Sequence, residues 1–209
     1  MAPGVDTEPM DKRIMGVLPN YRTVQDTGDV APITAKRKLW IASKDSFDYP
    51  IWFTAGLYSG LYQAENSNPQ FGQGIEGYMK RYAASFADQS IGNMLTEGVM
   101  PTILHEDPRY YRIGKGSGFH RTLYAMTRIF VAHTDSGNVR FNFSELIGNS
   151  IAVGFSNVYY SNSRDFDDNI EKLGMQLGTD ALSNVLKEFW PDFKRRFMQH
   201  KQVAQAGRQ

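Results

Sequence analysis

Small residues recur at every fourth position in three segments of the chain, and this spacing limits how those segments can pack. The three sets are Gly56, Gly60 and Ala64; Gly148, Ala152 and Ser156; and Gly174 with Gly178. Residues four apart share one face of an α-helix. Glycine inside a helix costs about 1 kcal/mol relative to alanine, and faces without bulky side chains let helix backbones approach closely. The pattern predicts tightly packed helices, and it leaves open whether they assemble in water or against a membrane.

Capping and breaking residues indicate where the helices begin and end. Thr34 is a suitable N-cap, Pro50 suits a first helical turn, and Pro101 and Pro191 are expected to end or kink helices. We find no continuous alternating strand pattern, and the sequence around Phe141 alternates for too few residues to build a sheet. The predicted fold is therefore all-α, a compact bundle of five or six helices with an extended N-terminal arm. The expected helices cover residues 35–42, 50–65, 75–98, 119–132, 144–160 and 169–190.

The chain divides into three predicted regions. Residues 1–33 contain four prolines and no helical period, so we expect an extended arm that packs as a strap or binds a partner. Residues 34–192 form the helical bundle domain. Residues 193–209 are basic, and we expect this tail to fray.

Composition excludes several classes of protein. The chain has 23 Lys and Arg against 22 Asp and Glu, so no global positive field is available to hold a nucleic acid. With no cysteine, it has no disulfide, Cys-ligated zinc, iron–sulfur cluster or thiol nucleophile. No uninterrupted apolar run reaches the roughly 18 residues of a spanning helix. We therefore expect no polytopic membrane protein, while surface attachment and an envelope protein stay open.

Polar residues at four-residue spacing lie on otherwise apolar helices and could meet inside the bundle. The candidate polar interior consists of Asn93, Glu97, Glu145, Asn149, Asp180 and Asn184. Buried carboxylates must be paired, hydrogen-bonded or protonated, so these residues suggest an acid–base or small-molecule site. A structural polar network or a solvated face is the alternative reading. The Glu-x-x-His pairs of di-iron bundles do not occur, so we expect no metal and no cofactor.

A glycine-rich loop with nearby basic residues is a candidate anion site. Gly114, Gly116 and Gly118 precede an expected helix, whose N-terminus could bind a phosphate. The candidate anion-binding residues are Arg109, Arg112, Lys115 and Arg121. The candidate catalytic residues beside them are His105, Glu106 and His120. The chain has no G-x-S-x-G or Walker A motif, and a flexible loop flanked by solvated arginines explains the same residues.

Four strings of sequence resemble a family of uncharacterised bacterial envelope proteins, over most of residues 11–195. They are DKRI at 11–14, GVLPNYR at 16–22, HEDPRYYR at 105–112 and SNVLKEFWPD at 183–192. Members of that family generally carry a secretion signal, so the resemblance implies a periplasmic or envelope location. It implies no activity.

The order of helices in the C-terminal half also resembles the type-2 phosphatidic acid phosphatase superfamily, which binds phosphate and forms a phosphohistidine. Ser144 stands where the family has Pro-Ser-Gly-His, and Ser163 with Arg164 matches the start of its third motif. The catalytic histidines of both motifs are missing here. The resemblance therefore implies a chain that is inactive by that mechanism.

The sequence favours a non-enzymatic helical envelope protein with a structural or interaction role, peripheral to a membrane. The expected partners are a membrane surface or an envelope protein, without nucleic acid, and a homo-oligomer stays open. The first alternative is a hydrolase acting on a phosphate- or lipid-bearing substrate. The second is a small-molecule binding bundle.

Overall fold

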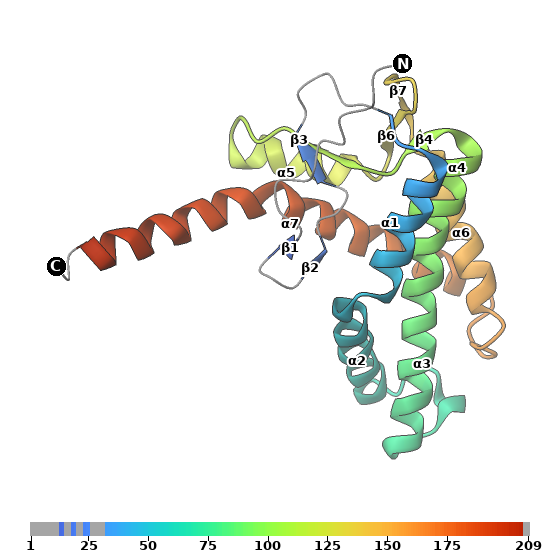
Figure 1. Ribbon diagram of the computed structural model, residues 1–209. Coiled ribbons are helices and arrows are strands. Elements are labelled where there is room, and N and C mark those ends of the chain that lie inside the picture. Colours follow the sequence, from blue (N-terminus) through green and yellow to red (C-terminus); the bar gives the residue numbers. More distant parts are fainter. Residues whose placement is uncertain (1–12, 15–17, 20–22, 26–31, 207–209) are drawn as a thin grey trace. The chain divides into compact units, whose positions relative to one another are not determined.

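The computed structural model describes residues 13–14, 18–19, 23–25 and 32–206, and most of them are helical (Figure 1), which confirms the all-α prediction. The chain forms two compact units. Unit 2 comprises residues 32–108 and 129–180. Unit 1 comprises the described parts of residues 1–31 together with residues 109–128 and 181–206.

Unit 2 begins with two helices joined at Asp48. Helix α1 (Ala35–Phe47) is capped by Thr34, whose hydroxyl accepts a hydrogen bond from the Arg37 amide at 3.3 Å. Helix α2 (Tyr49–Ala64) follows at once, with the Asp48 carboxylate accepting from the Tyr49 amide at 2.8 Å and Pro50 in the first turn. Both starts agree with the predicted capping signals.

The next segment is one continuous helical rod of three parts. After the 3₁₀ turn η1 (Pro69–Phe71), helix α3 (Gly74–Asn93) runs into the π-helix η2 (Met94–Val99) and then into α4 (Met100–Leu104). The rod continues through Pro101, so the expected helix end at this proline is not observed. Pro101 is the second residue of α4 and lies directly after the π-helix η2. Helices α1 and α6 (Phe143–Ser156) both pack on η2, and α2 packs on α3 (Figure 1).

Unit 2 also contains a small antiparallel sheet that the sequence did not predict. Strands β4 (Glu106–Asp107), β6 (Val131–Thr134) and β7 (Val139–Phe141) pair in the order β4-β6-β7. These strands are too short for a visible alternation of apolar and polar residues. Helix α6 begins at Phe143, one residue before the predicted start, because Asn142 rather than Ser144 provides the cap and accepts from the Glu145 amide at 3.0 Å.

Unit 1 joins the described part of the N-terminal arm to two later segments. Strand β3 (Thr23–Gln25) pairs in parallel with β5 (Tyr110–Arg112), and β1 (Arg13–Ile14) pairs with β2 (Leu18–Pro19). Helix α5 (Gly118–Thr127) and the part of α7 (Phe166–Ala206) from Ala181 onward complete the unit. Helix α7 continues through Pro191, so the prediction that it ends near Trp190 is wrong.

Candidate functional site

The helices of unit 2 bury small residues and expose large apolar ones. The buried positions of α2 are Pro50, Ile51, Ala55 and Ser59, and those of α6 are Ser144, Gly148, Asn149, Ala152, Val153 and Ser156. Glycine, alanine and serine occupy five of the six buried positions of α3, and Arg81 is the sixth. Water-soluble domains usually place Leu, Ile and Phe inside, so this arrangement is the reverse of the common one.

Two glycines show how closely these backbones approach. A Cβ placed on Gly98 would lie 2.8 Å from the Ala42 Cβ, and one on Gly148 would lie 2.9 Å from the Thr96 side chain. These contacts set α1 and α6 against η2 at distances that no larger residue permits. The predicted close packing is present at Gly148, whereas Gly98 was not among the predicted positions. The predicted packing is absent at Gly60, Gly174 and Gly178, which are exposed and have nothing within 4 Å of an added Cβ.

Exposed and half-buried apolar side chains lie on α1, α2, α3 and α6. The Trp52 and Phe86 rings lie 4.4 Å apart, and the Phe86 and Phe47 rings lie 6.3 Å apart. Beyond Phe47, a groove leads to Phe155 of α6. The outward stripe of α2 extends this surface, with Phe53 exposed by 73%. We call these residues the apolar band: Phe47, Trp52, Phe53, Leu57, Leu61, Phe86 and Phe155.

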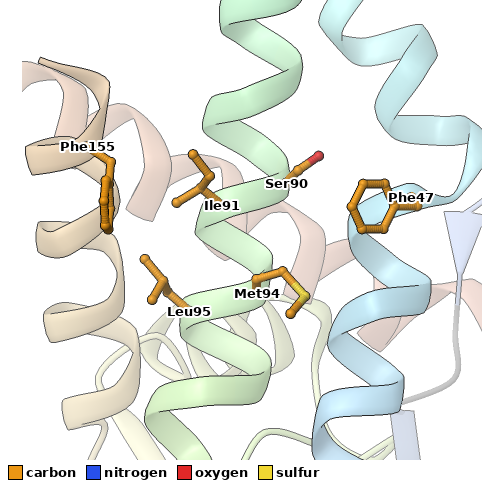
Figure 2. A pocket seen from close by; sticks show the side chains of 6 residues that line it. All are labelled: Phe47, Ser90, Ile91, Met94, Leu95 and Phe155. Carbon is orange, nitrogen blue, oxygen red and sulfur yellow. The ribbon is translucent and has the colours of Figure 1, made fainter. Parts of the chain in front are cut away.

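The groove lies where α3 becomes η2 and has a volume of about 290 Å³ (Figure 2). Ile91 and Leu95 point toward Phe155, whereas Ser90 and Met94 lie on the side of Phe47. The Ser90 hydroxyl donates to the Ser46 carbonyl at 2.9 Å, so the one polar lining side chain is already engaged. The groove therefore presents hydrocarbon surface.

Exposed cations surround a tryptophan on α1. The Arg37 guanidinium carbon lies 4.4 Å from the centre of the Trp40 ring, and the Lys44 Nζ lies 5.8 Å from it. Lys44 lies one helical turn before Phe47, which is the residue of α1 that lines the groove. The Ser43 hydroxyl reaches the Met94 sulfur at 3.9 Å, which places this turn of α1 beside the groove.

A hydrogen-bonded cluster around the half-buried Asp88 in unit 2 was not predicted. Asp88 of α3 accepts hydrogen bonds from the hydroxyls of Tyr159 and Tyr160, the latter at 2.7 Å. Lys172 lies 5.0 Å over the Tyr160 ring. Burial raises the pKa of Asp88 against the opposing effects of both tyrosines and Lys172, and burial lowers the pKa of Lys172. Burial also raises the pKa of the nearby Tyr62 to about 12.

The candidate catalytic residues have separate surroundings. Glu106 is buried and caps α6, accepting from the Ser144 amide and from Arg140 Nε at 2.8 Å each. His105 is 83% exposed, with Nδ1 3.8 Å from Asp135, which holds Lys38. His120 belongs to unit 1 and is exposed on α5. The hydrogen bonds of Glu106 give it a structural role as the cap of α6. Of the other two candidates, His105 lies beside Asp135, and His120 belongs to the other unit.

Two of the predicted anion-binding arginines already hold carboxylates of the chain itself. Arg121 Nε donates to Glu188 at 2.7 Å, and its Nη1 lies 2.6 Å from Asp192. Arg112 Nη2 lies 3.1 Å from Asp192. The Gly114 amide donates to Glu188 at 2.9 Å, so the predicted anion loop binds an internal anion. Arg109 lies 5.9 Å over the Tyr111 ring, and Lys115 is exposed.

The predicted polar interior is brought together in part. The Asn149 side-chain amide donates to Glu145 at 3.2 Å and to Asp180 at 3.4 Å. Glu97 is buried in η2, and Asn93 is half-buried on α3. Asn184 lies in unit 1 and is half-buried. Mutual hydrogen bonding among Glu145, Asn149 and Asp180 fits a structural network, and the small-molecule site stays a prediction.

Within the described part of the chain, no three His, Asp or Glu residues are grouped in a way that could hold a metal ion. No helix among the described residues combines the length and apolarity needed to cross a membrane. Comparison with family models, with curated proteins and with solved structures finds no match of any kind.

Proposed function

We propose that this chain is a non-enzymatic, membrane-associated protein of the bacterial envelope, with a structural or interaction role. In this proposal, unit 2 attaches to the lipid surface through the apolar band. The resemblance of residues 11–195 to an envelope family supports the location.

The main support for this proposal is that unit 2 buries small residues and exposes large apolar ones. Each large apolar side chain moved from water into hydrocarbon contributes about 1.5–3 kcal/mol, and the band holds several half-exposed or exposed ones. Interiors built from glycine, alanine and serine are characteristic of helices that pack within lipid, where large side chains face outward. Exposed apolar patches of this extent mark interaction sites.

The residues next to the band suit the boundary between lipid and water. Trp40 and Tyr49 are exposed, and amphipathic rings of this kind favour the head-group region. Arg37 and Lys44 are exposed beside Trp40 and can pair with lipid phosphates. Helices lying in the interface plane use this combination of aromatic, basic and apolar residues.

Vesicle flotation tests the proposal. The unaltered chain is expected to float with vesicles of phosphatidylcholine and phosphatidylglycerol. The double variant Phe53→Ser with Leu57→Ser removes two exposed apolar side chains of α2 and should lose most of that binding while its circular dichroism is unchanged. Val139→Ser is the matched control, since Val139 is exposed on β7 outside the band and its loss should leave flotation intact.

The same samples distinguish attachment to lipid from a self-associating protein. Sedimentation velocity without lipid measures whether a second copy covers the band. A stable dimer that never floats, and that Phe53→Ser with Leu57→Ser converts to a monomer, contradicts the membrane proposal.

A further inference from the structure

The groove between Phe47 and Phe155 is a site of its own within the apolar band. Six residues line it: Phe47, Ser90, Ile91, Met94, Leu95 and Phe155 (Figure 2). From this groove we infer that unit 2 binds one acyl chain of a phospholipid whose phosphate pairs with Lys44. The inference rests on the proposed function and names the ligand of the same surface.

The chemistry of the lining selects hydrocarbon. Five of the six lining residues are apolar, and the hydroxyl of Ser90 donates to Ser46. The Ser46 hydroxyl donates back to the Ser90 carbonyl at 3.1 Å, so this pair of serines satisfies itself. A sugar, nucleotide or peptide backbone would leave its polar groups without partners in such a groove. An alkyl chain has no such groups to satisfy.

The walls of the groove are preformed by close helix packing. Gly98 lets α1 approach η2, and Gly148 lets α6 approach the same element. Phe47 and Phe155 are therefore held on opposite sides of the α3–η2 junction. A π-helix places an additional residue in the turn and shifts the direction of the side chains that follow. Because the backbones of α1 and α6 are already held against η2, the protein loses little backbone entropy when a flexible chain enters the groove.

Charge at one end of the groove complements a phospholipid head group. Lys44 is exposed and lies one turn before Phe47 on α1. Ser43, the residue before it, contacts the Met94 sulfur at the groove wall. A chain lying along Met94 and Ile91 would place the attached phosphate near the Lys44 ammonium group. This complementarity favours a phospholipid over an uncharged hydrocarbon or a second copy of the chain.

Photolabelling in solution tests the groove apart from membrane attachment. The probe is a short-chain phosphatidylglycerol with a diazirine near the end of one acyl chain, used below its micelle-forming concentration. We expect the label on residues 90–95 and on Phe155. Ile91→Trp fills the groove and should reduce labelling about tenfold, because excluding even a pair of methylene groups accounts for such a factor. Ile75→Trp, the same enlargement at an exposed position of α3 outside the apolar band, should leave labelling unchanged.

Two further variants test the acyl-chain and phosphate contacts separately. Phe155→Ala removes one wall at a half-exposed position and should lower labelling even if Ile91→Trp fails to fold. Lys44→Ala should reduce labelling to the level of a diazirine-bearing alkyl alcohol, which has the chain but no phosphate. Lys36→Ala, at an exposed lysine two turns away, is the control and should not change labelling.

The outcomes separate the inference from the proposed function. Label spread equally over Phe53 and Leu57, or unchanged in folded Ile91→Trp, overturns the groove even if the protein floats with vesicles. Labelling that survives Lys44→Ala overturns the phosphate pairing. Groove labelling by the soluble probe without flotation keeps the inference and rejects the membrane surface.

Discussion

At the scale of single residues, Glu188 shows how a fully buried carboxylate is stabilised, because both of its oxygens accept hydrogen bonds. The Tyr110 hydroxyl donates to it at 2.8 Å, and Arg121 and the Gly114 amide donate to its other oxygen. A buried charge is tolerated only with such partners. The sequence pointed to Arg112 and Arg121 as anion ligands because they are basic and near glycines. It could not show that the anions are Glu188 and Asp192, whose positions in the chain are far away.

Asp88 leads to a prediction on pH. Its pKa is raised by burial above the ordinary 3.8, so the folded state binds the proton more tightly than the unfolded state does. The free energy of unfolding should therefore fall as pH rises from about 4 through the folded-state pKa, by about 1.4 kcal/mol per unit of difference. Asp88→Asn should remove this decline. Urea unfolding of both proteins across that pH range measures it.

Tyr159 provides a check on the origin of that decline. The Tyr159 hydroxyl lowers the pKa of Asp88 in opposition to burial. Tyr159→Phe should therefore extend the decline in unfolding free energy to higher pH. If the unfolding free energy of the unaltered protein and of Asp88→Asn changed with pH in the same way, the decline could not be assigned to Asp88.

At the scale of elements, glycines in similar sequence patterns should respond in opposite directions to the same substitution. Gly148→Ala places a Cβ 2.9 Å from the Thr96 side chain and 3.0 Å from its backbone nitrogen, so α6 must shift away from η2. We expect a loss of about 1–3 kcal/mol in unfolding free energy. Gly174→Ala meets nothing within 4 Å and should gain about 0.5–1 kcal/mol.

Thermal unfolding of the two variants measures the comparison directly. A lower midpoint for Gly148→Ala with a higher one for Gly174→Ala is the expected result. Equal shifts would mean that the α6–η2 approach does not limit packing. Gly98→Ala, which meets Ala42 at 2.8 Å, repeats the test at the contact between α1 and η2.

At the scale of the whole molecule, the division into two units leads to a prediction about which part of the chain is needed for attachment to lipid. Every residue of the apolar band belongs to unit 2. Truncation after Arg195 keeps Asp192 with its arginines and removes the rest of α7. The truncated chain should float with vesicles as the full chain does. Loss of flotation, with helicity otherwise maintained, would assign attachment to the basic C-terminal residues instead.

Local sequence was enough to locate some elements and not others. Thr34, Pro50 and the apolar spacing of α1, α2 and α6 act within one or two turns, so these helices were predicted near their observed positions. The continuation through Pro101 depends on the preceding π-helix, which no local pattern indicates. The Asp88 cluster joins residues about 70 positions apart. A paired tyrosine at 159 and 160 was its only trace in the sequence.

The sequence by itself determined that the chain is helical and that some helices pack closely, because helix periodicity and capping are local properties of neighbouring residues. Only the tertiary structure decided which faces are covered. In the folded protein, the helix face that carries Gly148 is buried and the face that carries Gly174 is exposed. Phe53 and Phe155 lie on the outside. Burial depends on which other elements lie against a face, and those elements come from distant parts of the chain.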